Sequence, residues 1–159
     1  MENFRVKTDP DYLKALRHSA AHLMAQAVVR LYPDAKLTVG PVTDDGFFYD
    51  IDLGGKHLTP DDLKIIEEGM KKIVKENLKL TYSEMDREAA KKFLKETHQP
   101  YKVELVDSIP EGEPITFYKQ GDFIDLCEGP HVRYTAELKH FKLLNFSGAY
   151  WKGDQNNPV

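Results

Sequence analysis

The sequence predicts an α+β fold, a mainly antiparallel sheet covered by helices. Three observations indicate it. Residues 10–31 repeat apolar side chains at helical spacing. Residues 36–53 are typical of two strands joined by an Asp-Gly hairpin turn. The later strands and helices do not follow the regular strand–helix–strand alternation of a parallel sheet. The 159 residues can bury the core of one domain. We expect an arm over residues 1–9 and a domain over residues 10–159.

The composition is that of a soluble globular protein, with 41% hydrophobic and 30% charged residues. The net charge of −4 argues against a domain that grips nucleic acid by charge alone, and it leaves room for a local basic patch. No apolar run approaches the ~20 residues that cross a bilayer, and the first nine residues lack the apolar core of a signal peptide. The single cysteine forms no internal disulfide. We therefore expect a cytoplasmic protein without a membrane partner.

The first element is a helix over residues 10–31. Thr8 or Asp9 can cap it, a proline suits its first turn, and Tyr32-Pro33 ends it. Its apolar stripe consists of Leu13, Leu16, Ala20, Leu23, Met24, Ala27 and Leu31.

Two histidines, His18 and His22, fall nearly opposite that stripe and four residues apart, so their Cβ atoms are about 5–6 Å from each other. Small side chains line their side of the helix, namely Ala15, Ala21, Ala25 and Val29. We expect both faces of the helix to be covered, with the imidazoles in the tighter space. Spacing alone leaves a second reading open, in which one histidine is a buried structural residue and the other lies at the surface.

Two strands over residues 36–42 and 47–53 follow, and Gly40-Pro41 is expected to bend the first. A second helix opens at Thr59 with a cap, a first-turn proline and early acidic residues. Four lysines lie near its end, namely Lys71, Lys72, Lys75 and Lys79. They suit the solvated end of a helix, and a patch that contacts a tRNA backbone is the alternative.

The remaining pattern gives short elements. We expect a helix that Ser83 or Asp86 caps and that ends near Thr97, with a stop at Gln99-Pro100. The expected strands are residues 80–83, 101–106, 115–119, 123–127 and 139–146, with a tight turn at residues 120–121. Aromatic residues then gather late in the chain, over residues 147–151.

A second histidine motif lies in Cys127-Glu-Gly-Pro-His131. Gly129 and Pro130 exclude a helix here, so the cysteine and the histidine lie on a tight turn that follows a strand. Such a turn can aim a thiol and an imidazole at one point. Alone, CxxxH is more often an incidental buried cysteine with a nearby surface histidine.

Together, HxxxH on a helix and CxxxH on a turn are far more specific than either motif, because the helix can face the turn across one site. With the rest of the chain they resemble the editing domain of bacterial-type threonyl-tRNA synthetase. The matching stretches are His18-Ser-Ala-Ala-His22-Leu, Gly40-Pro-Val, Gly46-Phe-Phe-Tyr-Asp50, Tyr101-Lys102-Val, Asp125-Leu-Cys-Glu-Gly-Pro-His131 and Gly148-Ala-Tyr-Trp-Lys-Gly-Asp154. They span residues 10–157, and the motifs look more distantly like those of alanyl-tRNA synthetase editing domains.

The resemblance implies that residues 10–159 form an editing domain, which hydrolyses the ester of serine mischarged onto tRNA(Thr). Its implied partners are the 3′ end of that tRNA and the rest of the synthetase. We expect either a fragment that lacks the aminoacylation core or a free-standing editing protein. A non-catalytic tRNA-binding module is a further alternative.

The resemblance also implies the site. The catalytic candidates are His18, His22, Lys102, Cys127 and His131, and the substrate-binding candidates are Asp125, Gly129 and Pro130. The histidines can supply hydrogen bonds and proton transfer, and Lys102 a positive charge. Asp125 can hold the ammonium group of the substrate or orient a neighbour, and a covalent mechanism through Cys127 is an alternative.

The two related branches differ in their metal. In the alanyl branch two histidines, a cysteine and a histidine hold zinc, whereas the threonyl branch, as the resemblance implies, uses similar residues without a required metal. We therefore expect no required cofactor. The alternative is a zinc hydrolase with His18, His22, Cys127 and His131 as ligands.

Overall fold

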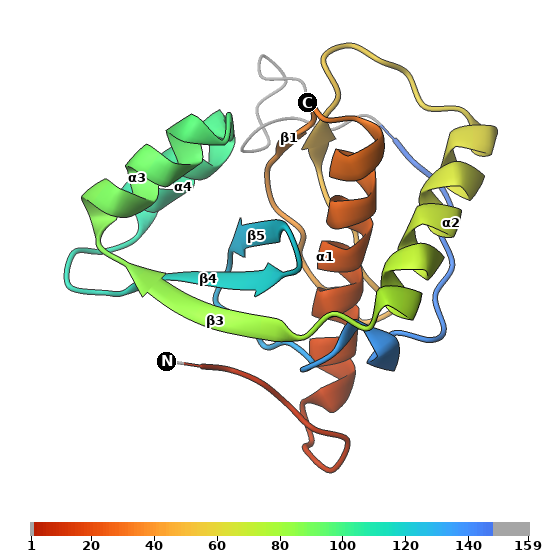
Figure 1. The fold of residues 1–159 in the computed structure, drawn as a ribbon, viewed down its shortest axis with the longest axis horizontal. Coiled ribbons are helices and arrows are strands. Elements are labelled where there is room, and N and C mark those ends of the chain that lie inside the picture. Colours follow the sequence, from red (N-terminus) through yellow and green to blue (C-terminus); the bar gives the residue numbers. More distant parts are fainter. Residues whose placement is uncertain (1, 148–159) are drawn as a thin grey trace.

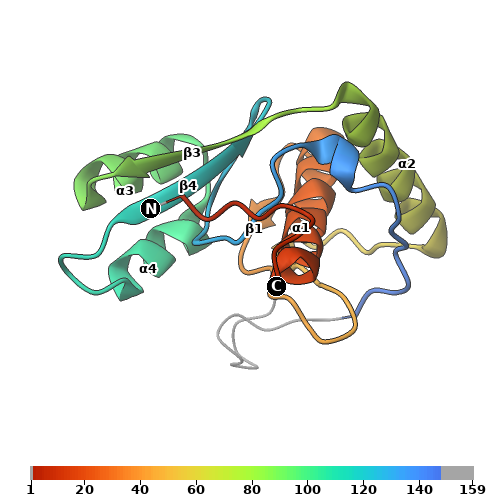
Figure 2. The same ribbon diagram turned by 90° about the horizontal axis from the view of Figure 1, so that it is seen from below.

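A computed structural model describes residues 2–147 of the chain, and it confirms the predicted α+β class. Helix α1 stands at the centre, with α2 on one side and a three-stranded sheet on the other, as Figure 1 shows. Helices α3 and α4 pack together at the far side of that sheet (Figure 2). No helix in the described part of the chain is long and apolar enough to span a membrane.

Helix α1 spans Tyr12–Leu31, close to the predicted bounds. Ala20, Leu23 and Ala27 pack toward α2, whereas Ala21 and Ala25 pack into a separate cluster, so both faces of the helix are covered as predicted. The predicted cap is wrong. Helix α1 begins after Asp11 without a side-chain bond, and Asp9 instead accepts a hydrogen bond from the backbone of Val6.

The predicted apolar stripe of α1 is buried only in the middle of the helix, and its end residues are exposed. Leu13 is 55% exposed and Leu31 is 39% exposed, because α2 and the neighbouring segments cover the middle of the helix. Helix α2, Pro60–Glu76, begins as predicted with a capping box, in which Thr59 and Asp62 bond to each other's backbone N–H groups.

The two strands after α1 are shorter than predicted. Strand β1 is Lys36–Leu37 and strand β2 is Ile51–Asp52, which pair antiparallel. Proline 41 cannot donate to a ladder. Gly40 lies so close to the ring of Tyr49 that an added Cβ would be 2.4 Å from the ring atom Cδ2. The regular ladder therefore ends after two residues, but single antiparallel contacts continue to the predicted turn, with Asp50 N–H donating to the Val39 carbonyl at 2.9 Å and a bridge between Val42 and Phe47.

The larger sheet has the order β3-β4-β5 and is antiparallel throughout. Its strands are Leu80–Met85, Ile115–Gln120 and Phe123–Leu126, close to three of the predicted ones. Gly121, with φ of +63°, makes the predicted turn between β4 and β5. In this register Asp125 lies opposite Tyr118.

Helix α3, Arg87–Glu96, is capped by Asp86 as predicted, but the predicted strand over residues 101–106 is wrong. That segment is α4, Pro100–Ser108. Its apolar alternation resembles a strand, yet Pro100 suits a helix start, and Lys102 and Val106 are buried at helical spacing. Val106 packs against α3, and this contact decides the conformation.

A short 3₁₀ helix, η1, spans Thr135–Glu137, and the predicted strand over residues 139–146 is also wrong. This segment has no strand partner. Its Leu143 N–H donates to the Glu67 carboxylate of α2 at 2.8 Å, so a side chain satisfies the backbone. The predicted aromatic group of residues 147–151 and the motif 148–154 lie outside the described residues, apart from Ser147.

Candidate functional site

The two histidine motifs converge, as predicted. His18 and His22 come from α1, and Cys127 and His131 come from the turn after β5. The sulfur of Cys127 lies 3.2 Å from Nε2 of His18 and 3.3 Å from Nε2 of His131. One ligand atom from each of the four residues lies within 4.8 Å of the others. We call these four residues the histidine–cysteine cluster.

The outer nitrogens of two imidazoles are held by their surroundings. Nδ1 of His18 donates to the carbonyl oxygen of Pro130 at 3.2 Å. Nδ1 of His131 lies 2.8 Å from the hydroxyl of Ser19, which also accepts from the backbone N–H of Val132. Each imidazole therefore presents Nε2 to the sulfur. Ser19 was not predicted as a site residue, although it lies directly after His18 in the motif.

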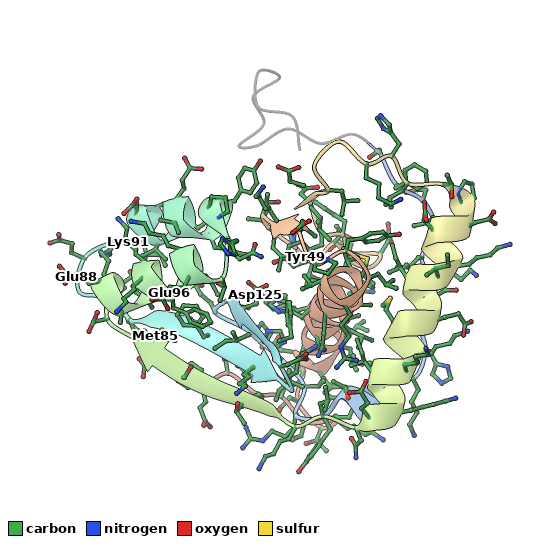
Figure 3. All side chains as sticks on the ribbon, turned by 45° about the horizontal axis from the view of Figure 1, so that its top comes forward. Tyr49, Met85, Glu88, Lys91, Glu96 and Asp125 are labelled. Carbon is green, nitrogen blue, oxygen red and sulfur yellow. The ribbon has the colours of Figure 1, made fainter. Side chains whose placement is uncertain are left out.

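A buried polar group adjoins the cluster. The Asp125 carboxylate forms an ion pair with Lys102 at 3.1 Å and accepts a hydrogen bond from the Tyr49 hydroxyl at 2.7 Å. Its second oxygen also lies 3.6 Å from Nδ1 of His22. Figure 3 shows Tyr49 and Asp125 beside α1, on the side of the three-stranded sheet. We call Asp125, Lys102 and Tyr49 the aspartate group.

Tyr49 is the second residue that the sequence analysis missed. It lies within the matching stretch Gly46-Phe-Phe-Tyr-Asp50, yet its alternating position indicated only a buried strand face. Burial and the adjacent Asp125 raise the pKa of Tyr49 well above the usual value, so the phenol stays protonated. Its hydroxyl donates a hydrogen bond to the Asp125 carboxylate.

Burial also sets the protonation of the cluster. It lowers the pKa of His18, and it lowers the pKa values of His22 and His131 well below the usual value. It raises the pKa of the Cys127 thiol to about 12. The three imidazoles are therefore neutral near pH 7 and the thiol keeps its proton. A mechanism that begins with a free Cys127 thiolate is disfavoured.

The turn itself carries Gly129 and Pro130, joined by a cis peptide bond. The Gly129 N–H donates to the Cys127 sulfur at 3.1 Å, and the carbonyl of Pro130 accepts from His18. Both residues thus hold cluster members in place. Their predicted contact with the substrate stays a prediction.

The expectation that no cofactor is required is corrected by the histidine–cysteine cluster. Three imidazole nitrogens and one sulfur, brought together from two segments of the chain, are the donor set of a zinc site. Three of the candidate ligands are also held by hydrogen bonds to neighbouring groups: His18 bonds to Pro130, His131 to Ser19, and Cys127 accepts from Gly129. The residues fit the metal, and the cluster suggests a zinc site.

Comparison with known families gives a match for the last part of the chain. Residues 115–159 match the family described as the threonyl and alanyl tRNA synthetase second additional domain. This stretch includes Cys127 and His131 but not the histidines of α1.

Comparison with whole proteins covers nearly all of the chain. It is 57% identical over 150 residues to a threonine–tRNA ligase of Geobacillus kaustophilus, 54% over 145 residues to one of Acetivibrio thermocellus, and 53% over 151 residues to one of Clostridium tetani. These alignments cover 91–95% of this chain and 23–24% of the relatives. The chain therefore spans about a quarter of the length of these ligases.

Proposed function

We propose that the chain, which is homologous to threonine–tRNA ligases over most of its length, is the editing domain of such a ligase and hydrolyses the ester of serine on tRNA(Thr). The observation that carries the proposal is the histidine–cysteine cluster next to the aspartate group, because ester hydrolysis needs proton transfer and charge stabilisation at one point. The proposed partners are the acylated 3′ end of the tRNA and the rest of a synthetase, in the cytoplasm.

The chemistry of the substrates explains the need for such a site. Serine lacks one methyl group of threonine, and a methyl group changes binding by only about 1–3 kcal/mol, so a site that selects threonine also accepts serine at times. A second site can hydrolyse the smaller product. It rejects threonine by steric overlap, because a packed wall does not move without strain.

We assign the metal to three members of the cluster, His18, Cys127 and His131, whose ligand atoms adjoin one another and whose other bonds fix them. A zinc ion there would act as a Lewis acid toward the ester carbonyl. The Cys127 thiol would give up its proton as a ligand, so metal uptake would release a proton.

His22 is then left to handle the proton of the attacking water. Its Nδ1 faces Asp125, so the other ring nitrogen is turned away from the carboxylate and can accept a proton. Asp125 stabilises the resulting imidazolium. This is the orienting role that the sequence left open, since both carboxylate oxygens are already engaged within the protein.

Lys102 supplies the positive charge. Its ammonium group is buried, lies 3.1 Å from Asp125, and has two further N–H donors for an oxygen of the substrate. We propose that it stabilises the charge that develops on the ester oxygens. The Asp125 carboxylate provides the counter-charge at this buried position.

The decisive experiment measures deacylation of seryl-tRNA(Thr) and threonyl-tRNA(Thr) by the 159-residue chain. We expect hydrolysis of the seryl ester only, loss of the rate with a strong chelator, and recovery with zinc. Equal rates on both esters would contradict the sieve, and a rate that survives removal of the metal would contradict the metal assignment.

Two variants separate the roles of the histidines. His131→Ala is expected to lose both bound zinc and activity. His22→Ala is expected to keep near-stoichiometric zinc by elemental analysis and to lose about 100-fold or more in rate. Loss of zinc from both variants would instead make His22 a ligand.

A further inference from the structure

The N-terminal arm, residues 2–6, crosses the chain beside the site. Figure 2 shows it running from the three-stranded sheet toward the start of α1. Its Phe4 forms a parallel bridge with His131. We propose that this arm is a positioning element of the site, which holds His131 in the place where it binds metal.

The backbone of His131 is bonded to the arm on both sides. The His131 N–H donates to the carbonyl of Asn3 at 2.9 Å, and the N–H of Arg5 donates to the carbonyl of His131 at 3.0 Å. Strand β5 ends at Leu126, so the sheet itself supplies neither bond. Because His131 is fully buried, these two groups need partners within the protein.

The side chains of the arm add a second set of contacts around His131. The ring of Phe4 packs edge-on against Tyr118, with ring centres 5.4 Å apart, and the Arg133 guanidinium lies 4.2 Å from the centre of the Phe4 ring. The Tyr118 ring in turn lies 4.5 Å from the imidazole of His131, and its hydroxyl accepts from the N–H of Asn3 at 2.9 Å. The arm thus touches His131 through its backbone and through Tyr118.

The turn is shaped to receive the arm. A Cβ added to Gly129 would lie 3.0 Å from Cβ of Asn3 and 3.2 Å from its carbonyl oxygen. Only glycine leaves room for the arm at this point, and φ of +87° also favours glycine. The arm therefore holds the backbone of His131, while the Ser19 hydroxyl bonds to Nδ1 of its ring and the Tyr118 ring lies beside it.

Two variants of Arg5 isolate the backbone bond. Arg5→Pro removes both the side chain and the N–H that donates to His131, whereas Arg5→Ala removes the side chain alone. The side chain contributes only a distant contact to Asp11, at 4.0 Å, which both variants lose. Because proline also fixes φ at residue 5 and restricts the backbone of Phe4, a difference between them reports the backbone of the arm at this point, including the bond to His131.

Three readouts follow the position of His131: the NMR signals of its ring protons in the metal-free chain, the affinity for Co²⁺ from its visible absorption, and kcat on seryl-tRNA(Thr). For Arg5→Pro we expect shifted ring signals, about 10-fold weaker Co²⁺ binding and a lower kcat with little change in KM, the size seen when groups that orient a metal ligand are removed. Arg5→Ala should match the unmodified chain in all three.

A folded Arg5→Pro chain with the ring signals and the Co²⁺ affinity of Arg5→Ala would overturn the proposal. Should Arg5→Pro not fold, Phe4→Ala takes its place, with Val6→Ala as the matched control because Val6 is 59% exposed. The proposal rests on the proposed function for two of the readouts, Co²⁺ binding and kcat. If the unmodified chain neither binds Co²⁺ nor hydrolyses the ester, the proposed function fails, and the ring signals still decide the role of the arm.

Discussion

Replacing Lys102 by methionine should destabilise the fold as well as stop hydrolysis. Lys102 is 4% exposed and its partner Asp125 is 2% exposed, with 3.1 Å between the charged atoms. Methionine keeps most of the volume but leaves the carboxylate buried without its counter-charge. Removing one partner of such a pair costs about 3–5 kcal/mol. The hydrogen bond from Tyr49 remains, so we expect the lower end of this range.

A double-mutant cycle separates stability from chemistry. Asp125→Asn leaves a neutral amide that can still bond to Tyr49, so the double variant with Lys102→Met buries no lone charge. We expect the double variant to regain most of the free energy of unfolding that Lys102→Met loses, measured by urea denaturation, and to remain inactive on seryl-tRNA(Thr).

Two results would refute this reasoning. If Lys102→Met unfolds at the same urea concentration as the unmodified chain, the ion pair is not buried as the geometry indicates. If the double variant hydrolyses the seryl ester at the original rate, Lys102 takes no part in the reaction.

Two further predictions test the surroundings of the site. Gly40→Ala should lower the free energy of unfolding by about 1–3 kcal/mol, measured by urea denaturation, because the added Cβ would overlap the ring of Tyr49. Gly46→Ala is the control and should change it little, because a Cβ there meets no atom within 4 Å. Equal effects of the two variants would be inconsistent with the close approach of Gly40 to Tyr49. The backbone bond from Leu143 lowers the pKa of Glu67, so this group stabilises the fold above its ordinary pKa and the contribution is lost as the pH falls through the lowered pKa. Glu67→Gln should therefore flatten the fall in unfolding free energy as the pH drops below the ordinary pKa of a glutamate, and an unchanged profile would contradict it.

Local signals in the sequence determined most of the helices. Helix α1 followed from its apolar spacing and from Tyr32-Pro33, and α2 followed from the capping box at Thr59. These signals act within a few residues, so they can be recognised without knowing how the rest of the chain folds. The same holds for the turn at Gly121.

Elements whose conformation depends on packing were predicted wrongly. Residues 101–106 alternate like a strand, and the contact of Val106 with α3 makes them a helix. Residues 139–146 look like a strand too, but no neighbouring strand is present in the described part of the chain, and the Glu67 carboxylate takes the backbone bond instead. Sequence patterns cannot distinguish such cases, because the partner lies far away along the chain.

The same division applies to the site. The sequence by itself identified the two motifs, since HxxxH and CxxxH are local patterns of nitrogen and sulfur donors, and the resemblance implied which residues form the site. Only the tertiary structure decided how they are arranged: it paired Asp125 with Lys102 and Tyr49, bonded Ser19 to His131, and set four ligand atoms within 4.8 Å of one another, where zinc fits. The physical reason is that protonation and metal binding depend on burial and on distances between distant segments, and these exist only once the chain has folded.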